Sequence, residues 1–170
     1  MNYYAAPMEG LTDRIWRQVH QKWFGAADAP TRYYAPFLSP PENRVLIPKK
    51  MAELAPEANA GTIVIPQLLA KDGELAAWMI GELRALGYTE VNLNLGCPSG
   101  TVTAKGKGSG MLRDPAVLDA FYAHHCVLHS LKQYPADNAV GHASLVFELC
   151  YPESLRIVDE QGWLWRLLGF

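Results

Sequence analysis

The chain has 170 residues, 49% of them hydrophobic and 19% charged, with a formal net charge of −2. This composition indicates a folded globular protein and excludes extended disorder, and no apolar run is long enough to span a membrane. The near-neutral charge gives no electrostatic sign of a nucleic-acid-binding protein. The 3 cysteines, an odd number, favour a reducing, cytoplasmic compartment.

The first sixty residues alternate short apolar segments with helical patterns. Residues 2–6 predict a strand, and the loop Pro7-Met8-Glu9-Gly10 follows it. A helix capped by Thr12 or Asp13 carries apolar residues four positions apart and stops at Gly25; these residues are Ile15, Val19 and Trp23. A second strand is expected over residues 32–38 and a helix over residues 45–54.

The next sixty residues repeat the alternation more clearly. Residues 62–69 are rich in β-branched side chains and predict a third strand. Asp72 caps the clearest helix, with Gly87 just past its end; one side of this helix carries Leu75, Trp78, Met79, Leu83 and Leu86. Residues 91–95 predict a fourth strand, and after a glycine-rich loop Asp114-Pro115 begins another helix.

This order of strands and helices predicts an α/β fold with a parallel sheet. A doubly wound sheet and a (β/α)8 TIM barrel both fit the order. Polar or unusual residues stand at or just past the ends of three strands, where a barrel has its active-site face; they are Pro7, Met8, Gln67, Asn94 and Cys97. No glycine fingerprint of a dinucleotide-binding sheet follows the first strand, so we favour the barrel.

Two amides line one side of the fourth strand. Val91, Leu93 and Leu95 suit the side packed on helices, which leaves Asn92 and Asn94 facing the barrel interior. Asn94, near the top, can offer an amide to a bound heterocycle; the alternative is that both asparagines bond only to neighbouring backbone, an interpretation we favour for Asn92. An unpaired buried amide costs roughly 1–3 kcal/mol, so each must have a partner.

Three segments together resemble the FMN-dependent tRNA-dihydrouridine synthases. They are APMEGLTD at 6–13, ELAPEANAGTIVIPQLLAKD at 53–72 and NLNLGCPSGTVTAKGKGSGMLRDP at 92–115. The resemblance covers residues 1–121 and implies the N-terminal half of an FMN-binding barrel. Another FMN barrel oxidoreductase, acting on a small pyrimidine, is the alternative enzyme, and the PQLL and N-x-G-C-P-S motifs favour the first family.

The resemblance also implies roles for individual residues. Pro7, Met8 and Glu9 would lie beside the flavin ring, Gln67 would hydrogen-bond it, and Asn94 would face the flavin and the target uracil. NADPH would reduce FMN, and the flavin would then reduce the 5,6 double bond of a uridine in tRNA. Cys97 would be the catalytic acid, a role that suits a thiol, since free thiols are mostly protonated near neutral pH. A buried inert thiol is the alternative.

The loop from Ala104 to Gly110 has the sequence AKGKGSG. Lys105 and Lys107 are candidate contacts to RNA phosphate, and the glycines permit close approach. A solvated loop without a ligand is an equal alternative. The spacing does not match a phosphate-binding P-loop.

Residues 122–170 match no segment of the family and form a divergent tail. A full barrel of this kind needs about 250 residues, so we expect only the first four βα units and an impaired enzyme that binds FMN weakly. A catalytically dead remnant acting as an interaction module is the alternative, and open sheet edges would allow self-association. We expect no metal site, although the tail contains His124, His125, Cys126 and His129.

Overall fold

The computed structural model describes residues 3–25 and 31–123, together with two short strands in the tail. These tail strands, β6 (Arg156–Val158) and β7 (Leu164–Arg166), pair antiparallel. Within the described residues, no helix has the length and apolar character needed to cross a bilayer. The cluster of histidines and Cys126 lies outside the described residues.

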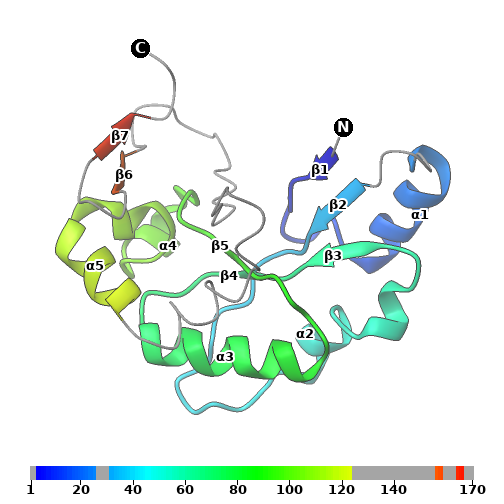
Figure 1. The fold of residues 1–170 in the computed structure, drawn as a ribbon, viewed down its shortest axis with the longest axis horizontal. Helices are drawn as coiled ribbons and strands as arrows, with labels where there is room; N and C mark the ends of the chain where they lie inside the picture. Colours follow the sequence, from blue (N-terminus) through cyan, green and yellow to red (C-terminus); the bar gives the residue numbers. More distant parts are fainter. Residues whose placement is uncertain (1–2, 26–30, 124–155, 159–163, 167–170) are drawn as a thin grey trace, which may run out of the picture.

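Parallel strands in chain order form the centre of the molecule. β1 (Tyr3–Ala5) pairs with β2 (Thr31–Tyr34), β2 pairs with β3 (Ile63–Ile65), and β4 (Gln67–Leu68) pairs with β5 (Asn92–Leu93). Neighbours in space are therefore neighbours in sequence (Figure 1). The predicted α/β class with parallel strands is confirmed, and the sequential strand order is compatible with the predicted barrel.

The predicted strand over residues 62–69 is divided in two. β3 ends at Ile65 and β4 begins at Gln67, with Pro66 between them. Proline has no N–H to give to a strand ladder, which explains the break. Pairing still continues across it, because Leu38 N–H donates to Gln67 O at 2.8 Å and Leu69 N–H donates to Leu38 O at 2.8 Å.

Three of the predicted helices begin at their predicted caps. α1 (Arg14–Phe24) starts after Asp13, α3 (Gly73–Ala85) after Asp72 and α5 (Pro115–Ala123) after Asp114. Each of these aspartates accepts a backbone N–H of the first turn at 2.8–3.0 Å. Gly87 has φ +95°, a left-handed conformation in which glycine ends a helix without strain.

Other segments differ from the sequence prediction. α2 (Pro48–Ala52) is shorter than the helix expected over residues 45–54, because Pro48 occupies its first turn. The predicted strand over 32–38 becomes β2 and an extended segment with a single bridge at Leu38. The helical turns α4 (Gly100–Thr103), η1 (Pro56–Asn59) and η2 (Gly108–Arg113) were not predicted.

Helix α1 turns its apolar stripe outward. Ile15, Val19 and Trp23 are 60%, 51% and 71% exposed, whereas Arg17 is completely buried. Figure 1 shows α1 at the end of the molecule beside β1 and β2, away from α3 and α5. The helical spacing was correct, but the inward side of this helix is the polar one.

Two apolar clusters form the core. In the first, Met79, Ile80 and Leu83 of α3 pack with Leu54 and Leu68. Val91, just before β5, and Leu93 of β5 lie against this cluster. In the second, Leu118 and Phe121 of α5 pack with Leu95, Met111, Ala70 and Ala76. As expected, the apolar side of the fourth strand is packed on helices, which leaves its asparagines on the opposite side.

Candidate active site

Three buried amide side chains meet at β4 and β5. Gln67 is the register partner of Asn92, and Asn94 follows β5 on the same side. Gln67 Nε2 donates to Asn92 Oδ1 at 2.7 Å, and Asn94 Nδ2 donates to Gln67 Oε1 at 3.0 Å. Their exposed fractions are 6% or less. The expectation that buried asparagines on this strand have partners is confirmed.

The hydrogen-bonded amides also connect to the turn that contains Cys97. Asn94 Oδ1 accepts the backbone N–H groups of Gly96 at 3.2 Å and Cys97 at 3.0 Å. Asn94 therefore fixes the turn that follows β5. β5 is shorter than the strand predicted over residues 91–95, and the cysteine lies in the turn just past its end. Cys97 is a free cysteine, and the residue is partly exposed.

The glycine-rich loop packs directly on the cysteine turn. Ser109 donates both its backbone N–H and its Oγ hydroxyl to Cys97 O, each at 3.1 Å. At Gly108, which has φ +56°, a Cβ atom would lie only 2.7 Å from Cys97 O. Only glycine fits this approach. The loop is thus part of the wall around Cys97.

The loop after β1 is held from behind by Thr12. The Thr12 hydroxyl accepts Met8 N–H at 2.8 Å, and Met8 O accepts the backbone N–H groups of Leu11 and Thr12. Pro7 is buried, whereas Met8 and Glu9 are exposed. Glu9 Oε1 accepts from Lys50 Nζ at 2.9 Å, which turns this carboxylate toward α2.

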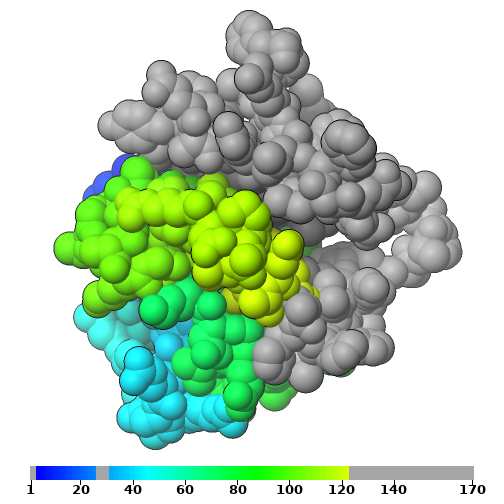
Figure 2. All heavy atoms as spheres, turned by 90° about the vertical axis from the view of Figure 1, so that its left-hand side faces the viewer, coloured from blue at the N-terminus to red at the C-terminus, as the bar shows by residue number. Residues whose placement is uncertain are grey.

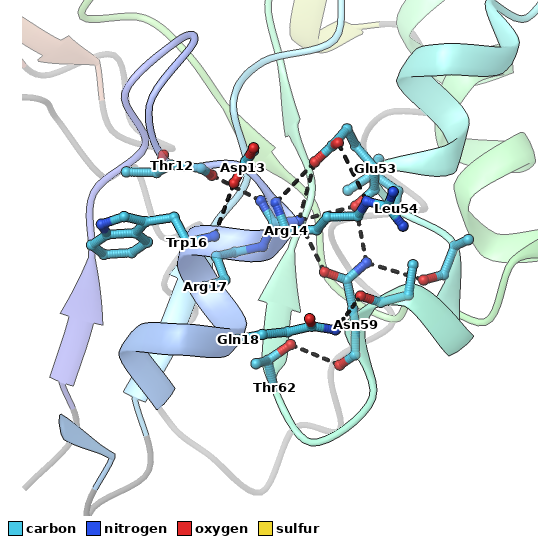
Figure 3. Close-up of polar contacts among 12 residues, drawn as sticks. Thr12, Asp13, Arg14, Trp16, Arg17, Gln18, Glu53, Leu54, Asn59 and Thr62 are labelled. Atoms are coloured by element: carbon cyan, nitrogen blue, oxygen red, sulfur yellow. Dashed lines mark hydrogen bonds and ion pairs between the residues drawn. The ribbon is translucent and has the colours of Figure 1, made fainter. Parts of the chain in front are cut away.

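Arg17 fixes this loop to the segment between α2 and β3 (Figure 3). Its Nη1 donates to Thr12 O at 3.0 Å, and its Nη2 donates to Glu53 O and to Asn59 Oδ1, both at 2.9 Å. Burial lowers the pKa of Arg17, and the nearby Glu53 carboxylate opposes that shift. The guanidinium ties three chain segments together from a position that water does not reach.

The structure thus joins Gln67, Asn94 and Cys97 in one connected set. Pro7, Met8 and Glu9 lie in the loop after β1, a strand that pairs with β2 in the other sheet and not with β4 or β5. Lys105 and Lys107 lie in the loop that packs on Cys97. Sequence reasoning missed two charged residues near these groups, Arg17 and Lys71. Arg17 could have been noticed as a cation four positions after the helix cap Asp13. For Lys71 the sequence offers only its position directly after the predicted strand that contains PQLLA.

The described part of the chain contains no group of three or more histidine, cysteine or acidic side chains able to hold a metal ion. The candidate site is therefore built from amides, one thiol and lysines. Primary amides offer both a donor and an acceptor in one plane. The amide nitrogens of Gln67 and Asn94 each carry a second N–H beyond the one used in the contacts above. Such a set can recognise the edge of a planar heterocycle.

Comparison with known proteins gives one family. A model of the dihydrouridine synthase family matches residues 4–125. A probable tRNA-dihydrouridine synthase 1 of Synechocystis is 31% identical over 121 residues, which are 68% of this chain and 31% of the relative.

Two further relatives match the same part of the chain. A tRNA-dihydrouridine(16) synthase of Aquipseudomonas alcaligenes is 32% identical over 71% of this chain and 38% of its own. A tRNA-dihydrouridine(20/20a) synthase of Xanthomonas campestris is 31% identical over 75% of this chain and 36% of its own. The chain spans about a third of the length of these curated relatives.

Proposed function

Because the chain belongs to the dihydrouridine synthase family, we propose that it carries the flavin and uridine face of an enzyme that reduces uridine in tRNA. The observation that supports this most directly is the hydrogen-bonded connection from Gln67 through Asn94 to the Cys97 turn. The amides would hold planar rings, and the thiol would meet the reacting carbon. The family's tRNA substrate fits the cytoplasmic location favoured by the cysteine count.

The residues present fit the ring of FMN, the cofactor on which this family generally depends. The second N–H of the Gln67 and Asn94 amides can bond to ring carbonyl or nitrogen atoms. Pro7 and the backbone of the loop held by Thr12 would border the ring. When bound, FMN would supply hydride to C6 of uridine, after reduction by NADPH.

Cys97 would complete the reaction at the other carbon of the double bond. As C6 gains hydride, electrons move to C5, and the thiol gives its proton to C5. The remaining thiolate regains a proton from water, so atoms and charge balance. Asn94 would hold the turn so that the sulfur stays in place, and the Ser109 contacts would keep the loop closed on it.

A second candidate function is an interaction module without catalysis. The observation favouring it is that Gln67, Asn92 and Asn94 already bond to one another and to the backbone of the cysteine turn, so their burial requires no ligand. In this case the amides and the cysteine turn would persist as structure, and the purified chain would be colourless. Flavin absorbance of the purified protein distinguishes the two candidates.

The test of the enzyme proposal is Cys97→Ala, in this chain or in a version extended by the remaining part of a relative. We expect reduction of FMN by NADPH to continue and uridine reduction in tRNA to fall by about 10²–10⁴-fold, the typical contribution of general acid catalysis. Cys126→Ala, outside the described residues, is the matched control. An unchanged rate of uridine reduction in Cys97→Ala would show that the acid has been assigned wrongly.

A further inference from the structure

We propose that Lys71, Lys105 and Lys107 form one cationic surface that contacts the RNA backbone next to Cys97. The identity of the RNA as tRNA rests on the proposed function; the surface itself rests on the structure. The lysines come from two distant parts of the chain, the end of the β4 strand segment and the glycine-rich loop. Lys71 could not be assigned to this surface from the sequence.

Gly106 brings the two parts together. Its φ of +66° is left-handed, and the Cβ position built on it lies 3.8 Å from Lys71 Cδ. Lys105 and Lys107 flank this glycine directly in the chain. The Lys71 side chain therefore lies against the loop at Gly106, the residue that separates the two other lysines in the chain. In Figure 2 the yellow-green surface that includes α4, η2 and α5 borders the green surface of α3 without a gap.

The three ammonium groups take part in no ion pair among the described residues. Burial lowers the pKa of Lys107, repulsion from Lys105 and Lys71 lowers it further, and Glu42 alone opposes the shift. In the described part of the chain the ion pairs use other cations, namely Arg14, Arg17, Arg32, Arg44 and Lys50. With Glu42 as the one acidic group that opposes their repulsion at Lys107, these lysines form a site whose mutual repulsion a bound polyanion would reduce.

The position of the loop connects this surface to chemistry. Ser109 and Gly108 lie against Cys97 O. A phosphate bound by the lysines would therefore be held by the same loop that contacts the cysteine turn. Phosphate contacts position a nucleic acid without reading its sequence. The lysines would therefore position the RNA strand along the surface so that one base reaches the cysteine.

An RNA backbone fits better than a single phosphate group. Lys71 and Lys105 are exposed, and side-chain ammonium groups are point charges that suit a line of phosphates. A single phosphate monoester is more often cradled by backbone N–H groups at a helix start. The phosphate of FMN or free inorganic phosphate is the competing ligand, and it becomes an outcome of the test.

The experiment measures the affinity of the 170-residue chain for a labelled tRNA transcript, without flavin, between about 50 and 200 mM salt. The variants are Lys71→Gln, Lys105→Gln and Lys107→Gln, singly and combined. Lys22→Gln and Lys49→Gln, at exposed positions on α1 and α2, are the matched controls. Replacement of each lysine by arginine tests whether charge alone matters and shows whether the loop still folds.

We expect each glutamine variant to lower the slope of log affinity against log salt by about 0.7–0.9, the value for one lost phosphate contact. The arginine variants should keep the slope, and the controls should not change it. An unchanged slope in the triple variant, or an equal loss in the controls, would overturn the proposal. So would full displacement of the RNA by millimolar FMN or inorganic phosphate, which would indicate a monoester site.

The binding assay needs no catalysis, so its result is independent of whether the protein reduces uridine. RNA binding that depends on these lysines in a protein that never forms dihydrouridine would support the surface and reject the enzyme. Uridine reduction with unchanged RNA binding in the triple variant would do the reverse.

Discussion

Gln67, Asn92 and Asn94 connect two strands through their side chains rather than through backbone alone. Each is buried, so the loss of a partner is not compensated by water. Asn94 has the largest share of this network because it bonds to Gln67 and to two backbone N–H groups of the cysteine turn. Stability and the position of the thiol are therefore coupled at this residue.

We expect Asn94→Ala to lower the free energy of unfolding by about 1–3 kcal/mol, because it leaves two N–H groups and the Gln67 carbonyl without their partner. Urea denaturation measures this loss. Cys97 should also react faster with thiol reagents, since its turn is less restrained. Asn43→Ala, at an exposed asparagine, is the control and should cost about 0.5 kcal/mol or less.

A double-mutant cycle with Gln67→Ala extends this prediction. The two side chains are bonded at 3.0 Å, so their coupling energy should be about 0.5–3 kcal/mol. Strictly additive losses would mean that the amide connection contributes nothing as a unit.

Arg17 provides a second prediction at the residue scale. Arg17→Met keeps much of the side-chain volume but leaves Thr12 O, Glu53 O and Asn59 Oδ1 without their donor. We expect a loss of at least about 1–3 kcal/mol of unfolding free energy. The matched control is Arg14→Met, because Arg14 pairs with the same Glu53 while 45% exposed; its cost should be about 0–1 kcal/mol. Equal losses of unfolding free energy in the two variants would contradict the proposal that Arg17 holds these three segments together.

At the scale of elements, helix α5 is attached to the rest of the molecule through apolar packing. Leu118 and Phe121 are buried in the second apolar cluster, and Tyr122 lies partly buried beside them. Burial raises the pKa of Tyr122 to about 12. Its neutral form is therefore favoured in the folded state.

This shift predicts an alkaline loss of stability. The unfolded chain releases the tyrosine proton near the ordinary value of 10.0, and the folded chain only near about 12. Below pH about 10, Tyr122 is neutral in both states and its burial contributes fully to the free energy of unfolding. This contribution falls by ~1.4 kcal/mol per pH unit as the pH rises toward about 12. Tyr122→Phe should remove this part of the loss in denaturation measured across that range. Tyr3→Phe, at an exposed site, is the control; identical pH profiles for wild type and Tyr122→Phe would refute the prediction.

At the scale of the whole molecule, the outward side of α1 and the strand β1 present apolar surface at one end. Tyr3 and Tyr4 of β1 are about half exposed, as are Ile15 and Val19 of α1, and Trp23 is more so. Among the described strands, β1 has a neighbour on only one side of its sheet. A strand with one open edge beside exposed apolar side chains favours association.

We therefore propose that copies of this chain associate through this end. Sedimentation at increasing concentration should show a reversible shift to a larger species, and Val19→Glu or Trp23→Glu should weaken it by at least about tenfold. Val117→Glu, at an exposed apolar position on α5, is the control and should behave as the wild type does. A monomer at every concentration tested would contradict the proposal.

The sequence by itself determined where α1, α3 and α5 begin, the parallel α/β class and the family. These features are local: an aspartate cap bonds within its own first turn, and a motif is read along one segment. It also placed Cys97 and Asn94 at the end of a strand, because period-two alternation ends visibly at the Gly96 turn.

Only the tertiary structure decided which groups meet. The bond between Gln67 and Asn94 depends on the register of β4 against β5, and the approach of Lys71 to Gly106 depends on how a distant loop folds back. The inward side of α1 likewise depends on Arg17 finding acceptors at Glu53 and Asn59, which outweighed its apolar spacing. Contacts between distant segments are set by packing and register, and no local pattern records them.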